Sequence, residues 1–218
     1  MGATPELRDL AKKYGYKVTS ADKSPSMYRA MTLLAKEDTG KEIFIEGDWL
    51  KMPGNEKYDL ILAHDSFNML AWKDWAKLLR RLNGITKKNG CVISQILLPI
   101  KSHTAEKVLE LYENGKIKTK PDLIQEVFRI CQRPGKKSVN INRGVKSFLN
   151  IAKNKRKYRF IEKFRVFNSK PIVPKKEEAE MIFRKHFKIS EICFAGDYEY
   201  CKFEPIYLLK KLRKIREI

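Results

Sequence analysis

The sequence contains little of what metal-binding and disulfide-bonded proteins require. Its 218 residues include only four cysteines and three histidines. No two cysteines form a CxxC pair, so zinc and dithiol motifs are unsupported and reduced core thiols are expected. His103 and His186 stand among predicted helices, without carboxylate or cysteine neighbours at metal-ligand spacing. We therefore expect no bound metal.

Long hydrophobic runs and targeting signals are also absent. The most apolar stretch, CVISQILLPI (91–100), is too short to cross a bilayer and contains Ser94, Gln95 and Pro99. The N-terminus has no charged segment followed by an apolar one, so a cytoplasmic protein is expected. No GxSxG, P-loop or HExxH motif occurs, which leaves out the enzyme classes that carry them.

Acidic residues are scarce relative to basic ones. The net charge is +20, of which residues 1–100 carry +4 and residues 101–218 carry +16. An excess of this size favours polyanionic partners, although a Lys-rich composition also occurs in thermophile proteins and needs no partner. The basic surface is expected in the second half of the chain.

What the sequence does contain is an alternation of strands and helices. Thr4, as the N-cap, and Pro5 start a helix that ends at Gly15, and Ser24 with Pro25 starts another. Apolar runs predict strands at 16–22, 42–49, 58–65 and 91–98, with a further helix at 72–83 and KKNG (87–90) as a turn. This alternation predicts an α/β fold with a doubly wound, mostly parallel sheet.

The remaining chain departs from this alternation. Residues 101–174 contain predicted helices without intervening strands (104–114, 121–132 and 144–154), which indicates a helical insertion. A helix at 175–187 and two strands around an AGD turn predict a C-terminal antiparallel pair. We therefore expect three parts: residues 1–100, the basic insertion 101–174, and residues 175–218, which complete the sheet.

The order of these elements resembles the class I S-adenosylmethionine-dependent methyltransferase family. The features that carry the resemblance are the opening turn GATPE (2–6), an acidic residue at the end of the next strand, GDW (47–49), the YDLI strand (58–61) and the terminal antiparallel pair. The resemblance implies a Rossmann-like fold, S-adenosyl-L-methionine as the cofactor and methyl transfer as the reaction. It covers most of residues 2–100 and, more weakly, 175–210.

The resemblance assigns the cofactor site to the carboxyl ends of the predicted strands. The turn Gly2-Ala3-Thr4, with Glu6, would wrap the methionine portion of the cofactor. Asp22 would accept both ribose hydroxyls, at a spacing of 20 residues from Gly2, unless it is an ordinary turn residue or N-cap. Lys23 and Met27 belong to the same predicted site, although Met27 also suits a core position.

Further candidates follow the third and fourth strands. Gly47, Asp48 and Trp49 would contact the adenine, with Asp48 accepting its amino proton. Asp65 and Ser66 lie where open α/β sheets bind ligands, and Asp65 is the candidate catalytic base. The segment HDSFN (64–68) lacks the Asn/Asp-Pro-Pro-Tyr/Phe signature of amino-directed nucleic-acid methyltransferases, which disfavours base N-methylation.

The methyl acceptor stays open between a small molecule and RNA. The stretch NKRKYRFIEKFR (154–165) interleaves aromatic and basic residues, which suits phosphate contacts and base stacking but equally a solvated element with a buried aromatic face. Two other functions remain. One is an inactive methyltransferase-like scaffold that binds nucleic acid. The other is a nicotinamide-dependent oxidoreductase, because Asp22 would also suit the ribose of a nicotinamide cofactor. The lack of a second turn glycine weighs against the oxidoreductase.

One strand is missing from this pattern. The sheet of the family has a central strand directly before the glycine turn, where this sequence has one residue. Two apolar strand edges would then be left unpaired. We therefore expect an N-terminally truncated sequence whose first strand is missing, or another segment that fills the gap.

Overall fold

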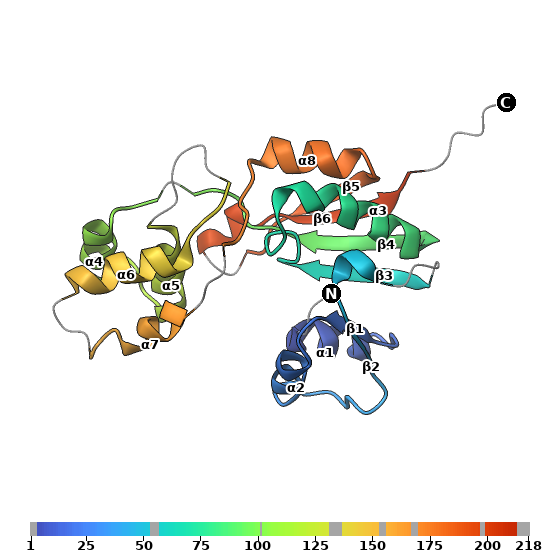
Figure 1. Ribbon diagram of the computed structural model, residues 1–218, viewed down its shortest axis with the longest axis horizontal. Coiled ribbons are helices and arrows are strands. Elements are labelled where there is room, and N and C mark those ends of the chain that lie inside the picture. Colours follow the sequence, from blue (N-terminus) through green and yellow to red (C-terminus); the bar gives the residue numbers. More distant parts are fainter. Residues whose placement is uncertain are drawn as a thin grey trace. The chain divides into compact units, whose positions relative to one another are not determined.

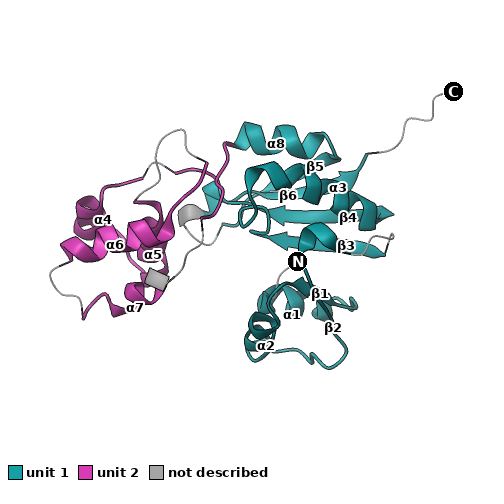
Figure 2. Ribbon diagram, in the orientation of Figure 1, with its two compact units in different colours: residues 1–97, 176–218 teal, residues 98–175 magenta. Residues whose placement is uncertain are grey.

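The computed structural model describes residues 4–52, 57–100, 102–130, 137–152, 156–166, 170–196 and 199–212. The chain divides into two compact units, one drawn from residues 1–97 and 176–218 and the other from residues 98–175 (Figure 2). No helix within the described ranges is long and apolar enough to cross a membrane.

The first unit begins with two helices and a two-stranded parallel sheet. The elements are α1 (Pro5–Lys13), β1 (Thr19–Asp22), α2 (Pro25–Thr32) and β2 (Ile43–Glu46). Both strands are shorter than the predicted ranges 16–22 and 42–49. Gly15 has a φ of 77° in the turn after α1, a left-handed conformation that glycine adopts without steric cost.

A four-stranded mixed sheet forms the rest of this unit (Figure 1). The chain continues through η1 (Trp49–Lys51), β3 (Tyr58–His64), η2 (Trp72–Asp74), α3 (Trp75–Ile85) and β4 (Thr86–Gln95). It returns with α8 (Lys176–Arg184), β5 (Phe187–Cys193), η4 (Glu199–Phe203) and β6 (Ile206–Lys211). The strand order is β3-β4-β6-β5, in which β3 and β4 are parallel and β6 is antiparallel to both neighbours. The predicted C-terminal antiparallel pair is confirmed.

The helices α3 and α8 lie side by side against the four-stranded sheet (Figure 1). Apolar residues recur at helical spacing along α3, and the buried ones are Trp75, Leu78, Leu79, Leu82 and Ile85. Phe183 of α8 meets the rings of Phe67 and Tyr207 edge-on, at centroid distances of 5.3 and 5.1 Å. These residues form the hydrophobic core of the unit.

The KKNG sequence (87–90) does not form the predicted turn but lies inside β4. The register shifts between the pairs Tyr58–Thr86 and Leu60–Cys91, so residues 87–90 bulge opposite Asp59. A Cβ at Gly90 would lie 2.7 Å from the Asp59 carbonyl oxygen, so the close approach of the two strands requires glycine. The prediction failed because a bulge and a turn use the same polar, glycine-containing composition.

The second unit is a helical bundle. It contains α4 (Ala105–Glu113), α5 (Lys120–Arg129), α6 (Ile141–Ile151), α7 (Arg159–Glu162) and η3 (Lys163–Val166). Thr104, Thr119 and Asn140 each cap the helix that follows by accepting a backbone N–H. α5 and α6 approach so closely that a Cβ at Gly144 would clash with the Val127 carbonyl oxygen. The core between the helices includes Val108, Leu123, Val127, Val145, Phe148 and Ile161.

Parallel strands alternating with helices confirm the predicted α/β class, but the strands of the first unit form two sheets rather than one. Within the described residues, β1 has a ladder partner only in β2, and β3 has one only in β4. Among the described strands, β1 and β3 therefore belong to two separate sheets.

Candidate functional site

The small sheet brings Asp22 and Gly47 together at the carboxyl ends of β1 and β2. The Asp22 carbonyl accepts the Gly47 N–H at 3.0 Å, which ties the two strand ends. The Asp22 side chain is partly buried, and its Oδ1 accepts the Ser24 N–H at 2.9 Å. Its Oδ2 has no hydrogen-bond partner among the described residues. One carboxylate oxygen thus stabilises the turn, and the other can accept a hydrogen bond from a ligand.

Asp48 and Trp49 follow the end of β2. Asp48 is exposed, and its Oδ1 caps η1 by accepting the Leu50 N–H at 2.9 Å. The indole N–H of Trp49 donates to the Ala21 carbonyl at 2.7 Å. Trp49 therefore fixes the segment after β2 to the end of β1.

The residues predicted to hold the methionine end lie at the start of α1. Gly2 and Ala3 lie outside the described residues. Thr4 occupies the N-cap position of α1, but its side chain makes no capping hydrogen bond, so the expected hydroxyl cap is wrong. Glu6 is exposed in the first turn of α1, where a carboxylate interacts favourably with the helix dipole.

Lys23 and Met27 lie next to Asp22 on the solvent side. Lys23 is exposed, and Met27 is 46% exposed on α2, a helix with no buried residue. A core role for Met27 is therefore wrong. Ser24 caps α2 by accepting the Met27 N–H at 3.2 Å, as the sequence predicts.

Asp65 directly follows β3 in a left-handed backbone conformation, with a φ of 50°. Aspartate is one of the few residue types that adopt this conformation at moderate cost. The Asp65 N–H donates to the Gln95 carbonyl at 3.2 Å, which ties the ends of β3 and β4. Its Oδ2 lies 3.9 Å from His64 Nε2, and the two side chains are 34% and 38% exposed. A carboxylate and an imidazole thus stand together at this strand end.

The side chains of Ser66 and Asn68 form hydrogen bonds with backbone groups at the same strand ends. The buried Ser66 hydroxyl donates to the His64 carbonyl at 3.2 Å. Asn68 is fully buried; it donates to the Leu97 carbonyl at 3.0 Å and accepts the Leu97 N–H at 2.9 Å. Asn68 therefore locks the turn after β3 to the segment after β4, a role that sequence reasoning missed.

Gln95 and Glu204 form a polar pair that sequence reasoning also missed. Gln95 ends β4, and its Nε2 donates to Oε2 of Glu204, which is 7% exposed, at 3.1 Å. Sequence reasoning could have found Gln95, because it is a polar residue at the end of an apolar run. No local signal points to Glu204, because only the antiparallel pairing of Ile206 with Gln95 brings Glu204 next to Gln95. In the described part of the chain, no cluster of three His, Cys, Asp or Glu side chains could hold a metal ion.

A buried ion cluster supports the small sheet from the side of α1 and α2. The Glu42 carboxylate pairs with Arg8 and with Lys12, each at 2.6 Å, and accepts the Tyr28 hydroxyl at 3.1 Å. Burial alone would raise the pKa of Glu42, but hydrogen bonds from Arg8 and Lys12 outweigh it and lower that pKa. The pKa of Tyr28 is raised, first by burial and then by the Glu42 charge. The cluster therefore ties α1 and α2 to Glu42, which directly precedes β2.

The aromatic residues of the basic stretch 154–165 point into the second unit. Residues 154 and 155 lie outside the described residues. Tyr158 is buried, and Phe160 and Phe164 pack against the same core. Lys157 lies above the Tyr158 ring at 5.5 Å and the Tyr112 ring at 5.7 Å. The interpretation as a solvated element with a buried aromatic face therefore fits, because Tyr158 is buried and the rings of Phe160 and Phe164 are partly covered by the core of the unit.

Residues 1–90 match the family described as a methyltransferase domain. No curated protein matches the sequence.

Solved structures share the fold at low sequence identity. PH0226 from Pyrococcus horikoshii OT3 is 16% identical, with a TM-score of 0.58, over 96% of this chain and 78% of its own. A Rhodobacter sphaeroides protein described as a Zn-dependent alcohol dehydrogenase is 14% identical, with a TM-score of 0.62, over 96% and 81%. A Burkholderia thailandensis 1,6-didemethyltoxoflavin-N1-methyltransferase with bound S-adenosylhomocysteine is 10% identical, with a TM-score of 0.57, over 97% and 69%. Such low identities establish the fold alone. Residues 1–90 are thus similar to a methyltransferase domain, and the solved structures show that the chain has a Rossmann-like fold.

Proposed function

We propose that the protein is an S-adenosylmethionine-dependent methyltransferase. The observation that carries this proposal is Asp22, a partly buried carboxylate at the carboxyl end of β1 with one oxygen open. Such a group suits the adjacent hydroxyls of a ribose. The methyltransferase match over residues 1–90 supports the same function and disfavours the oxidoreductase. The similar Burkholderia enzyme contains S-adenosylhomocysteine, the demethylated form of the cofactor.

In this proposal the cofactor lies along the carboxyl ends of β1 and β2. Asp48, which follows Gly47 at the bonded strand ends, would accept a hydrogen bond from the adenine amino group, with Trp49 beside the base. Lys23 and Met27 would border the ribose. The turn Gly2-Ala3-Thr4 and the start of α1 would hold the methionine carboxylate, because the first N–H groups of a helix have no intrahelical partner. Glu6, in the same turn of helix, would attract the methionine amino group.

The cofactor supplies an electrophilic methyl group on a sulfonium sulfur. The protein must align the acceptor with that bond and exclude water from it. Asp65 is the proposed base that removes the acceptor's proton, with Ser66 holding the turn that carries it. The hydrogen bond from the Asp65 N–H to Gln95 fixes the backbone from which this carboxylate extends.

The proposed acceptor is a small molecule, as the name of the Burkholderia enzyme states for that protein. RNA is the alternative, because residues 101–218 carry a net charge of +16. The basic segment 101–174 is the proposed substrate-side part of the protein. The packing of its aromatic residues against the core of the second unit favours the small molecule over a single-stranded nucleic acid.

Calorimetric titration with S-adenosylhomocysteine tests the cofactor assignment. We expect Asp22→Ala to weaken binding by about 1.5–3 kcal/mol, the cost of losing charge-assisted hydrogen bonds. Asp38→Ala is the matched control, because Asp38 Oδ1 accepts the Gly40 N–H at 2.8 Å in the same arrangement that joins Asp22 to Ser24. Unchanged affinity in a folded Asp22→Ala variant would remove Asp22 from the site. Tighter binding of NADH than of S-adenosylhomocysteine would support the oxidoreductase.

A further inference from the structure

One buried carboxylate, that of Glu42, contacts side chains from both helices beside the proposed cofactor site. The Glu42 side chain is 0% exposed, and the residue directly precedes β2. Its Oε2 accepts hydrogen bonds from Arg8 of α1 at 2.6 and 2.9 Å and from the Tyr28 hydroxyl of α2 at 3.1 Å. One carboxylate oxygen therefore joins α1, α2 and the start of β2.

Arg8 and Tyr28 hold equivalent positions in their helices. Each is the fourth residue of a helix that begins with proline, and its N–H donates to the carbonyl of the N-cap residue, Thr4 at 3.3 Å and Ser24 at 3.1 Å. The two side chains thus extend from the first turns of α1 and α2. Those turns follow the segments proposed to hold the methionine and ribose parts of the cofactor. The shared contact with Glu42 therefore fixes these two parts of the site relative to each other.

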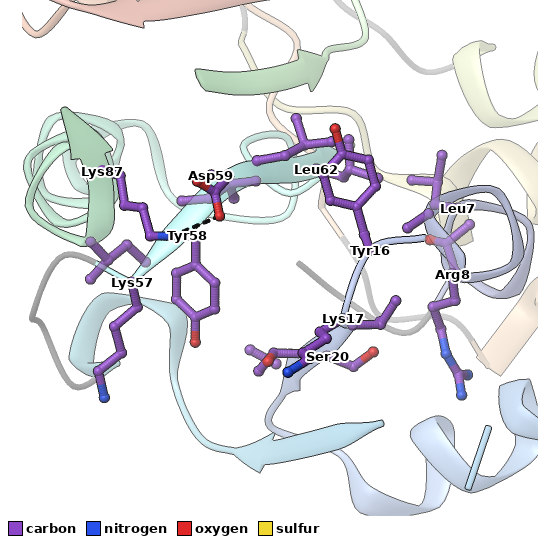
Figure 3. A pocket seen from close by; sticks show the side chains of 18 of the residues that line it. Leu7, Arg8, Tyr16, Lys17, Ser20, Lys57, Tyr58, Asp59, Leu62 and Lys87 are labelled. Atoms are coloured by element: carbon purple, nitrogen blue, oxygen red, sulfur yellow. Dashed lines mark hydrogen bonds and ion pairs between the residues drawn. The ribbon is translucent and has the colours of Figure 1, made fainter. Parts of the chain in front are cut away.

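The contacts of Arg8 fix the direction of its side chain and not only its charge. In Figure 3 its guanidinium group is turned away from Leu7, its neighbour on α1. Its Nη2 donates to the Thr32 hydroxyl at 2.9 Å as well as to Glu42, and its central carbon lies 4.8 Å from the centre of the Tyr28 ring. A planar group with donors in fixed directions suits such a site, whereas the ammonium group of lysine is a compact point charge.

Tyr28 extends the connection to β2. Its ring stacks on that of Phe44, with a centroid distance of 4.2 Å and an angle of 13° between the planes. Phe44 lies in β2, three residues before Gly47, whose N–H donates to the Asp22 carbonyl. Because α2 has no buried residue, apolar packing holds this helix weakly, which leaves much of its positioning to Tyr28.

The proposed cofactor is a long ligand, and its amino acid, ribose and adenine parts are bound by different elements. Contacts to linked parts of a ligand reinforce one another only if the elements that make them stand at the matching spacing. An element that has to be ordered during binding lowers the affinity by the cost of that ordering. A link between the elements therefore affects the intact cofactor more than a fragment that meets one end of the site.

We propose that Arg8, Tyr28 and Glu42 are positioning residues of the cofactor site. They hold the first turns of α1 and α2 at the spacing that one molecule of S-adenosylmethionine requires, without contacting the cofactor themselves. This role depends on the proposed function, in which the two turns hold two parts of the same cofactor.

Calorimetric titration with two ligands tests this role. S-adenosylhomocysteine contains both parts, whereas 5′-methylthioadenosine has the adenosine part without the amino acid. Arg8→Lys keeps a cation beside Glu42 but loses the planar set of donors, so it should loosen α1. We expect this variant to weaken S-adenosylhomocysteine binding at least about tenfold and 5′-methylthioadenosine binding less than about threefold.

Tyr28→Phe should give a different pattern. It keeps the ring on Phe44 but loses the hydrogen bond to Glu42, so it loosens the ribose side of the site. Since both ligands contain the ribose, both should weaken by the same factor of about three to ten. A general loss of stability would not separate the two variants in this way.

Two further variants complete the test. Leu82→Ala is the control for stability alone, because Leu82 is fully buried in the core of the four-stranded sheet; it should leave both affinities within about twofold. If Arg8→Lys does not fold, Thr32→Val, which removes one bond to the guanidinium, should give the same selective loss at a smaller size. A loss in Arg8→Lys that is absent, or equal for the two ligands, overturns the positioning role while the cofactor assignment stands. Failure of the unmodified chain to bind S-adenosylhomocysteine overturns both.

Discussion

The two sheets of the first unit differ in the interactions that stabilise them. The four-stranded sheet and the helices against it enclose the large side chains of Phe67, Trp75, Phe183 and Tyr207, which are all 0% exposed. In the small sheet, by contrast, α2 has no buried residue, and Leu33 after it is 86% exposed. The small sheet depends on an ion cluster where the larger one depends on a hydrophobic core.

This difference bears on function, because the proposed cofactor residues Asp22 and Asp48 belong to the small sheet. A region with few buried apolar contacts opens at a lower free energy than the core of the same protein. We therefore expect the small sheet to exchange its amides faster than the four-stranded sheet, and a bound ligand to slow that exchange.

The largest expected effect is a core truncation. Trp75→Ala should lower the free energy of unfolding by about 3–5 kcal/mol, because it removes a fully buried side chain that packs against Phe67 and Phe183. Leu33→Ala should change it by less than about 0.5 kcal/mol, because the side chain is already in water. Urea titration measures both. Similar losses for the two variants would contradict the comparison of the two sheets.

A smaller and local effect is expected from the ion cluster. Arg8→Ala should destabilise the small sheet by about 3 kcal/mol, because the Glu42 carboxylate stays buried and loses a partner. Lys87→Ala, which breaks the exposed pair with Asp59, is the control and should cost at most about 0.5 kcal/mol. Amide exchange should report the Arg8 effect in β1 and β2 but not in β4 and β6. An equal effect in all four strands would show that the sheets open as one unit.

Acid should weaken the same cluster. The folded pKa of Glu42 is lowered from its ordinary value of 4.5, so its contribution is complete above that value and is lost as the pH falls through the folded pKa. Protection factors in β1 and β2 should therefore fall below about pH 4.5 relative to those in β4 and β6. Glu42→Gln should remove this difference. A ratio of protection factors that does not depend on pH in the unmodified chain would exclude Glu42 as the cause.

The smallest effect is expected in the second unit. It belongs to the part of the chain after residue 100, which carries a net charge of +16, whereas residues 1–100 carry +4. Arg156 and Lys163 are exposed, while Tyr158 is buried and Phe160 and Phe164 pack against the core of the unit. Any binding of single-stranded RNA should therefore be electrostatic, and the double variant Arg156→Glu, Lys163→Glu should reduce the salt slope by about 1.4, or 0.7 for each lost phosphate contact. Filter binding across a salt series measures the slope, with S-adenosylhomocysteine affinity as the control. Binding that survives high salt would indicate base stacking and contradict the burial of these rings.

Local patterns predicted much of this protein. The alternation of apolar runs with capped helices predicted the α/β class, the helical insertion and the terminal antiparallel pair, because these elements arise from short-range periodicity and turn chemistry. Position at the end of a strand, together with the resemblance to the methyltransferase family, selected Asp22, Asp48 and Asp65 as candidates. Composition could not separate the bulge at residues 87–90 from a turn.

Contacts between residues far apart in the chain were decided by the tertiary structure alone. Arg8 and Glu42 are 34 positions apart, and Gln95 and Glu204 are 109 apart, so no local pattern joins them. The burial of Asn68 and the aromatic face of the basic stretch likewise depend on what packs against them. By itself, the sequence determined which elements form and where their polar ends lie, since those follow from neighbouring residues. Only the tertiary structure decided which strands pair and which charges are buried, because hydrogen-bond pairing and desolvation depend on partners brought together by the whole fold.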